Sequence, residues 1–189
     1  MPRDGDTHAA DRAPASGGDR RGGRFEKAAV TVRPSVPGDA ESIARLFLES
    51  AEHHAGLDPE RYFVPDLEWI AARYRDGSQH PRQPPGEAVT LVAEAGGQIL
   101  GFVDAQLERP LDAMHRDTIY CHIAEIAVHS GHRSQGIGEQ LLRAAEEWGR
   151  ARGAEYASLE YHAANTRAAQ FYQDRLGYWV ASSIAIRRL

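Results

Sequence analysis

Apolar side chains recur along this chain with two periods, and the two periods predict where strands and helices lie. A period of two marks a strand with one buried face, whereas a period near 3.6 marks a helix that buries one side. Strand patterns occupy residues 28–33, 88–95, 98–107, 118–128, 156–161 and 180–186. Helix patterns occupy residues 39–54, 66–75, 136–152 and 166–176. The mixture of the two periods indicates an α/β fold.

The order of these patterns predicts how the sheet is built. Gly96 and Gly97 separate two strand patterns, which favours a tight antiparallel hairpin. The long apolar pattern at 118–128 suits a central strand. Asp39 is a suitable N-cap for the first helix, and residues 77–86 are expected to form a loop. Strands, helix, strand, helix and strand in that order predict an α/β sheet of mixed direction.

The first 27 residues differ in composition from the rest of the chain. They are rich in Gly, Asp, Arg, Ala and Pro and have almost no large apolar side chain, so they cannot offset the entropy of ordering. We therefore predict a disordered tail over residues 1–27 and a single domain over residues 28–189. The tail has nearly balanced charges, which is not typical of an arm that binds nucleic acid.

Charge and cysteine content exclude several classes of function. The chain has 22 Lys and Arg residues against 27 Asp and Glu residues, a net charge of −5, which offers no broad basic surface for nucleic acid. Cys121 is the only cysteine, so we expect neither an intramolecular disulfide nor a zinc site, as is usual in the cytoplasm. No export signal or membrane span is indicated, and no metal is expected.

A glycine-containing turn between the central strand pattern and the third helix pattern is suited to binding phosphate. The turn reads Arg133-Ser134-Gln135-Gly136-Ile137-Gly138. The first turn of a helix has unpaired N–H groups and a partial positive charge, and glycines let an anion approach the backbone. A P-loop would need Lys and Ser or Thr at 137 and 138, and a dinucleotide fingerprint would need Gly in place of Leu141. We therefore predict a different pyrophosphate site.

The same residues carry a family resemblance. Val128 precedes the R-x-x-G-x-G run from Arg133 to Gly138 by five residues, and the chain continues with Asn165, Ala168, Phe171-Tyr172 and Leu176-Gly177-Tyr178. These motifs resemble the acetyl-CoA signature and the second motif of the GNAT family of N-acetyltransferases. The likeness is strong over residues 118–180, whereas residues 29–107 match only in the order of elements.

The resemblance implies a fold and a set of binding residues. The fold would be a GNAT-type mixed, mostly antiparallel central sheet of about six to seven strands flanked by about four helices. The central strand would diverge from its neighbour beyond a bulge, so that pantetheine could bind its backbone. Acetyl-CoA would then contact Ile126, Ala127, Val128, Arg133, Ser134, Gln135, Gly136, Ile137, Gly138, Asn165 and Tyr172.

Acetyl transfer to an amine needs a proton acceptor and a donor to the departing sulfur. The resemblance assigns the sulfur to Tyr172, although a core role would also explain this residue, and Asn165 also suits a helix N-cap. Regular alternation predicts that His122 shares a face with Ala124 and Ile126, opposite Glu125. The resemblance implies a base or acidic group six or four residues before Val128, which points to His122 because Ala124 is at the other place, and an imidazole has a suitable pKa. His122 is therefore the favoured base, but a bulge would turn Glu125 inward, and a water chain would also serve.

The resemblance implies an acyltransferase that uses acetyl-CoA as co-substrate, by direct attack in a ternary complex. A small primary amine is the expected acceptor, and a protein N-terminus or lysine is the alternative. Candidate acceptor-site residues are His53, His54, Asp58, Glu60, Arg61, Tyr62 and Glu108. A non-catalytic acyl-CoA-binding sensor is the competing class of function. A homodimer is one candidate assembly.

Overall fold

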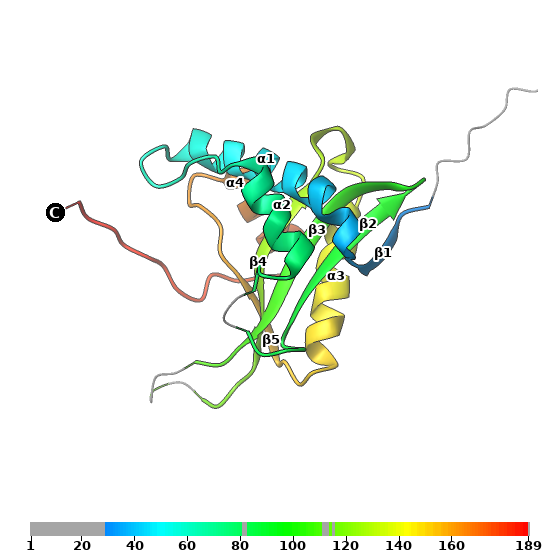
Figure 1. Cartoon of the computed structure of the whole chain (residues 1–189). Coiled ribbons are helices and arrows are strands. Elements are labelled where there is room, and N and C mark those ends of the chain that lie inside the picture. The colour runs from blue at the N-terminus through cyan, green and yellow to red at the C-terminus, as the bar shows by residue number, and fades with distance from the viewer. Residues whose placement is uncertain (1–28, 81–82, 111–113, 115, 189) are drawn as a thin grey trace, which may run out of the picture.

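The computed structural model describes residues 29–80, 83–110, 114 and 116–188 (Figure 1). The predicted tail over residues 1–27 lies outside the described residues. The strands are β1 (Thr31–Pro34), β2 (Ala88–Ala95), β3 (Gln98–Glu108), β4 (Tyr120–Val128) and β5 (Tyr156–Leu159). The α-helices are α1 (Ala40–Leu57), α2 (Leu67–Asp76), α3 (Ile137–Arg150) and α4 (Thr166–Ala169). Two 3₁₀ turns, η1 (Pro37–Asp39) and η2 (Ser130–His132), and the π-helix η3 (Gln170–Arg175) complete the described elements.

The strands form one sheet in the order β1-β2-β3-β4-β5. Each pairing from β1 to β4 is antiparallel, and β5 pairs with β4 in parallel. Gly96 and Gly97, with φ of 58° and 78°, form the predicted hairpin turn between β2 and β3. The predicted α/β class and mixed, mostly antiparallel sheet are confirmed, but the described residues form five strands instead of six to seven.

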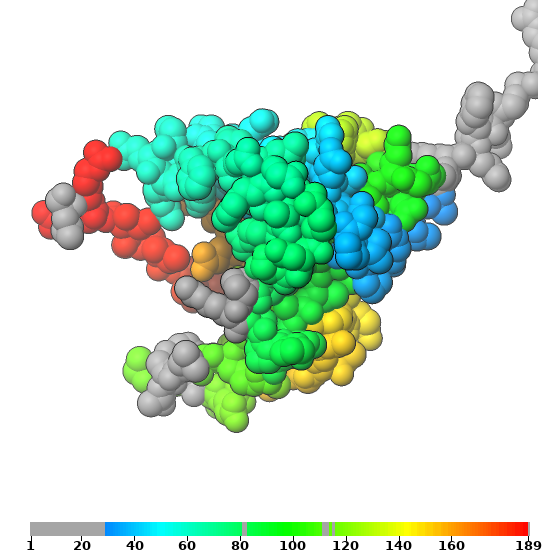
Figure 2. All heavy atoms as spheres, in the orientation of Figure 1, coloured from blue at the N-terminus to red at the C-terminus, as the bar shows by residue number. Residues whose placement is uncertain are grey.

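The predicted last strand at 180–186 is wrong. This segment has no partner strand, and Ile184 and Ile186 are exposed. Figure 2 shows the red C-terminal segment standing clear of the body of the molecule over much of its length. The apolar alternation that predicted a strand is present in the sequence, but a strand also needs a neighbouring edge to pair with.

Helices cover both faces of the sheet, and each face has its own core. On one face, α3 places Leu141, Leu142 and Ala145 against β2, β3 and β4. On the other face, α1 places Ile43 and Leu46 against Phe102 and neighbouring strand residues, and α2 packs against α1. Between these two helix layers, the pairing of β4 with β5 ends at Ile123 and Leu159, before β4 itself ends.

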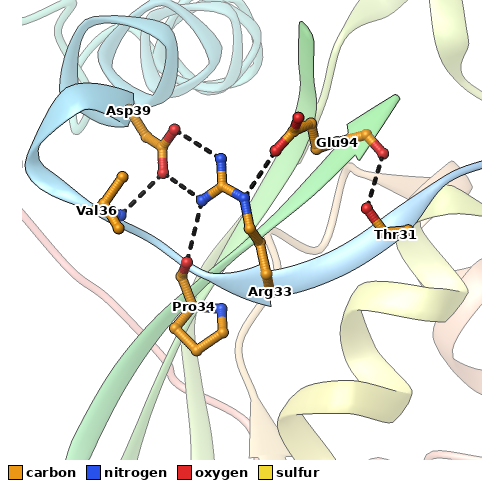
Figure 3. A network of polar contacts seen from close by, with 6 residues as sticks. All are labelled: Thr31, Arg33, Pro34, Val36, Asp39 and Glu94. Atoms are coloured by element: carbon orange, nitrogen blue, oxygen red, sulfur yellow. Dashed lines mark hydrogen bonds and ion pairs between the residues drawn. The ribbon is translucent and has the colours of Figure 1, made fainter. Parts of the chain in front are cut away.

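A charged network fixes the start of the first helix (Figure 3). Asp39 is the N-cap residue, as predicted, but its carboxylate does not cap α1. It accepts hydrogen bonds from the guanidinium of Arg33, at 2.7 and 3.0 Å, and from the backbone N–H of Val36. Arg33 also donates to Glu94 of β2 at 2.7 Å, and its hydrogen bonds lower the pKa of Asp39. The network therefore ties β1, β2 and the beginning of α1 together.

Candidate active site

A cavity of about 750 Å³ lies where β4 and β5 diverge. The parallel ladder runs from Tyr120 opposite Tyr156 to Ile123 opposite Leu159 and then ends, whereas β4 continues to Val128. The opening is bordered by α1, α2, the start of α3, the end of β5 and the α4–η3 segment. This volume is typical of a small-molecule site.

The backbone of β4 presents polar groups to this opening. His129 donates its N–H to the carbonyl of Leu100, so the preceding pair, Val128 with Gly101, is a non-hydrogen-bonded pair of the antiparallel ladder. The N–H and C=O groups of Val128 therefore point away from β3, towards the side that β5 has left. The carbonyl of Val128 accepts a hydrogen bond from Nε of Arg133 at 3.0 Å.

The start of α3 forms one end of the cavity. Gly136 is its N-cap in the left-handed conformation, with φ of 82°, and Ser134 also has a positive φ of 62°. Successive backbone turns of this kind direct N–H groups into one concavity, where the helix dipole adds positive potential. Of the predicted binding residues, those that line the cavity are Ile126, Ala127, Val128, Arg133, Ser134, Gly136, Ile137, Gly138, Asn165 and Tyr172.

Gln135 is the predicted binding residue of this turn that does not line the cavity. Its side-chain amide donates to the carbonyl of Gly131 at 3.5 Å. If Gln135 contacts acetyl-CoA, it does so through its backbone and not through its side chain. Gly138 lies beside Phe171, whose ring would be 3.5 Å from an added Cβ, so this helix start is close to the α4–η3 wall.

Two arginines that the sequence motifs did not single out also border this end. Arg167 donates to the hydroxyl of Ser134 at 3.3 Å, and Arg175 pairs with Glu139 at 2.7 Å. Both line the cavity and, with Arg133, place three guanidinium groups near the helix start, where Glu139 pairs with that of Arg175. Both arginines belong to the helix pattern at 166–176, which begins directly after Asn165, and this closeness to a predicted binding residue could have indicated them from the sequence. Such an arrangement can hold a diphosphate.

A bulge in β4 determines which side chains face the other end. Ile123 pairs with Ala105 and Glu125 pairs with Asp104, so Ala124 is an extra residue. The predicted alternation is therefore wrong beyond Ile123, because the bulge places Glu125 on the same face as His122 instead of the opposite one. Glu125 lines the cavity.

The surroundings of Glu125 raise the pKa of its carboxyl group towards neutrality. Desolvation is the main effect and raises its pKa to about 7. Ser50 of α1 opposes the shift by donating a hydrogen bond to Oε1 at 2.9 Å, while the carboxylate of Asp104 adds to it. Burial also raises the pKa of Asp104, which accepts 2.6 Å hydrogen bonds from Tyr74 and Thr90.

His122, the favoured base from sequence, does not line the cavity. Its Nδ1 lies 3.1 Å from the hydroxyl of Ser158 on β5, within the part of the sheet where β4 and β5 are still paired. β4 and β5 diverge only after the next pair, Ile123 with Leu159. His122 therefore lies behind the opening that Glu125 faces.

Tyr172 lies in the π-helix η3 and is 9% exposed at the wall of the cavity. Burial, with a smaller contribution from the charge of Glu125, raises its pKa to about 12, so the phenol is neutral at physiological pH. The sequence predicted a continuous α-helix here, but the wider π turn contains this residue, and π turns are frequent at functional sites. Asn165 caps α4, because its Oδ1 accepts the N–H of Ala168 at 3.0 Å.

The predicted acceptor residues are only partly brought together. His53, His54 and Tyr62 line the cavity, whereas Asp58, Glu60, Arg61 and Glu108 do not. Asp58 instead lies 3.5 Å from Nε2 of His162, and Glu60 pairs with Arg188.

The described residues form neither a metal centre nor a membrane-spanning helix. No three His, Cys, Asp or Glu side chains converge there into a group able to hold a metal ion. Within those residues, too, no helix combines the length and apolar character needed to cross a bilayer.

The chain belongs to the Acetyltransferase (GNAT) family, whose model matches residues 43–178. An acetyl transferase of rice, GW6a, is 32% identical over 100 residues, which cover 49% of this chain and 24% of the rice protein. This chain therefore spans about a quarter of the length of that relative.

Solved structures show the same fold at low identity. A mutant of the BH1408 protein from Bacillus halodurans has a TM-score of 0.74 at 21% identity and covers 84% of this chain and 99% of its own. Aminoglycoside N-acetyltransferase AAC(6')-Iy, solved in complex with CoA, has a TM-score of 0.63 at 18% identity and covers 86% of this chain and 95% of its own.

Proposed function

We propose that this protein transfers the acetyl group of acetyl-CoA to a primary amine by direct attack in a ternary complex. The observation that carries the proposal is the cavity at the divergence of β4 and β5, with the start of α3 at one end and the carboxyl of Glu125 at the other. Family membership and the CoA complex of the aminoglycoside N-acetyltransferase support acetyl-CoA as the donor.

The diphosphate of the coenzyme would lie at the N–H groups that begin α3, beside Arg133. Pantetheine would then follow the free edge of β4, where the backbone of Val128 replaces the missing pairing with β5. This path brings the thioester to the middle of the cavity, between Glu125 and Tyr172.

In the reaction, the carboxylate of Glu125 accepts a proton from the ammonium form of the acceptor, and the neutral nitrogen attacks the thioester carbonyl. The N–H of Val128 is a suitable donor to the oxyanion, because it points into the opening. The intermediate collapses to the amide as its C–S bond breaks, the nitrogen's second proton passes to the departing thiolate to give the free thiol of CoA, and Glu125 releases its proton to solvent. A thiol is a stronger acid than a phenol of pKa about 12, so Tyr172 stabilises the thiolate mainly by a hydrogen bond.

Glu125 replaces His122 as our proposed base, since it lines the cavity and has a pKa near neutrality. A non-catalytic acyl-CoA sensor would share the phosphate site but would release no thiol. A homodimer, a cytoplasmic location and a small molecule as the acceptor stay predictions.

The replacement Tyr172→Phe tests the proposed reaction. It keeps the ring in the core and removes the hydroxyl, so kcat should fall about 10- to 1000-fold while the affinity for acetyl-CoA is retained. The measurement is release of free CoA thiol from acetyl-CoA with a panel of amines, together with calorimetric binding of acetyl-CoA. An unchanged kcat would remove Tyr172 from the mechanism, and binding without thiol release from any amine would favour the sensor.

A further inference from the structure

The elements α1 and α2 and their connection, residues 40–76, contribute one wall of the cavity, which we call the acceptor wall. It meets β4 where Ser50 donates a hydrogen bond to Glu125. Many of its side chains carry a flat ring. These are Phe47, His53, His54, Tyr62, Phe63 and Trp69.

Part of the acceptor wall is held in place by ring contacts. The rings of His54 and Tyr62 lie 5.3 Å apart, and Tyr62 meets His162, which lies between β5 and α4 in the sequence, edge-on at 6.2 Å. His162 accepts the N–H of Ala164 at Nδ1, which leaves Nε2 as the nitrogen facing Asp58 at 3.5 Å. The connection between α1 and α2 is thereby linked to the segment between β5 and α4.

Other rings of the acceptor wall are uncovered. Phe63 is 78% exposed and Trp69 is 54% exposed, although both line the cavity. Large apolar side chains at a cavity mouth gain free energy when an apolar ligand covers them. The exposed rings therefore favour a ligand with an apolar surface of its own.

The acceptor wall carries no carboxylate. None of the Asp and Glu side chains of residues 40–76, all of which are described, lines the cavity. Asp58 and Glu60 face His162 and Arg188, and Asp66 caps α2 by accepting the N–H of Trp69. The charged group that the wall does present is cationic.

That cationic group is Arg73, whose guanidinium lies 4.9 Å above the ring of Trp69. Beyond the wall, the described carboxyl groups that line the cavity are Glu125, Glu139 and Glu160. Glu139 is paired with Arg143 and Arg175 at the coenzyme end, and Glu160 is exposed on the β5 side. Glu125, bonded to Ser50 of α1, is thus the carboxyl group next to the acceptor wall.

We propose, on the basis of the function proposed above, that the acceptor is a primary monoamine attached to an aromatic ring or a similarly flat apolar group. Its single ammonium lies at Glu125, and its ring lies against Tyr62, Phe63 and Trp69. A polyamine or an aminoglycoside carries several positive charges, each of which needs a partner when it leaves water. The acceptor wall offers such charges Arg73 and no carboxylate.

The test compares 2-phenylethylamine with 1,4-diaminobutane and with the aminoglycoside sisomicin, at saturating acetyl-CoA, by release of CoA thiol. We expect kcat/KM to be at least about ten-fold higher for 2-phenylethylamine, because burial of a ring contributes a factor of this order. Equal or higher kcat/KM for the diamine, which could use Glu125 and Glu160 together, or for sisomicin would overturn the inference.

Variants connect the preference to the wall. Phe63→Ala should raise KM for 2-phenylethylamine about ten-fold and leave KM for acetyl-CoA unchanged. Trp179→Ala is the matched control, because Trp179 is 70% exposed and does not line this cavity. An unchanged KM in Phe63→Ala, or an equal rise in Trp179→Ala, would contradict a binding role for the wall.

A binding measurement separates this inference from the proposed function. Calorimetry of 2-phenylethylamine with the CoA-loaded protein reports on the acceptor wall even when no thiol is released. If none of the three amines releases thiol, but 2-phenylethylamine binds and Phe63→Ala abolishes this binding, acetyl transfer to these amines would be refuted. The same result would support binding of the ring at the acceptor wall. Turnover of the other amines, with no binding of 2-phenylethylamine, would refute the inference and leave acetyl transfer standing.

Discussion

At the scale of single residues, the central feature is Ala124, the extra residue of β4. Without it, Glu125 would point into the α3 face of the sheet, where a carboxyl group would lie among apolar side chains. With it, Glu125 reaches the cavity and the hydroxyl of Ser50, although it stays close to Asp104. Alternation along a strand could not predict this position, because a bulge has no reliable signature in one sequence.

A base with a pKa of about 7 should leave its signature in the pH dependence of the reaction. For the unmodified protein, kcat/KM should rise with pH through about 7 as Glu125 becomes ionised. Glu125→Gln should lower kcat by a factor on the order of 10²–10⁴ and remove this limb.

Ser50→Ala is the companion variant for this profile. It removes a hydrogen bond that lowers the pKa of Glu125, so the limb should move to higher pH while the reaction persists. A limb that stays in place in both variants would assign the proton to a water chain.

The same carboxyl group should reduce stability when it is ionised. Its pKa is raised on folding, so its contribution to stability is full below its ordinary pKa of about 4.5 and is lost as the pH rises through about 7. At pH 8, Glu125→Gln should therefore increase the free energy of unfolding, by at most about 3 kcal/mol. Urea denaturation at pH 8 and at pH 4.5 measures this, and a gain of the same size at both values would exclude ionisation as its cause.

At the scale of elements, α3 approaches the sheet closely because Gly149 has no side chain. A Cβ at this position would lie 2.5 Å from Cβ of Cys121 on β4 and 2.7 Å from its sulfur. This contact fixes the distance between α3 and the strand that borders the cavity. The helix start that we propose as the phosphate site depends on the same placement.

The pair Gly149→Ala and Gly56→Ala tests this packing. Both glycines lie in α-helices, but nothing lies within 4 Å of a Cβ at Gly56. Gly149→Ala should destabilise the protein by about 1–3 kcal/mol through overpacking, whereas Gly56→Ala should stabilise it by up to about 1 kcal/mol. Thermal or urea unfolding gives both values, and similar effects in the two variants would show that contact with Cys121 does not limit the position of α3.

Elements with a strong local pattern were predicted well from the sequence. The Gly96-Gly97 hairpin and the glycine turn before α3 depend on neighbouring residues, and both are confirmed as structural elements. The π turn at Tyr172 and the missing strand at 180–186 depend on which elements meet in space. Periodicity carries no information about that, which is why both predictions failed.

At the scale of the whole molecule, the cavity combines segments that are distant in the sequence. The motifs in residues 128–138 and 165–178 predicted which residues line the end of the cavity that we propose for the coenzyme, because those residue types recur at fixed spacing. Its other end was predicted only in outline, since Ser50, Phe63 and Trp69 belong to no motif and meet β4 only in the folded protein. The proposed reaction depends on a diphosphate bound at the start of α3.

Calorimetric titration of CoA into Gly136→Asp is the most direct test of that claim, with Gly97→Asp as its control. Both glycines have a positive φ, 82° and 78°, and open space where a Cβ would be, so backbone strain is matched. We predict that Gly136→Asp abolishes measurable CoA binding, because a carboxylate would occupy the anion site, while Gly97→Asp binds CoA like the unmodified protein. CoA binding of unchanged affinity in Gly136→Asp would contradict the account.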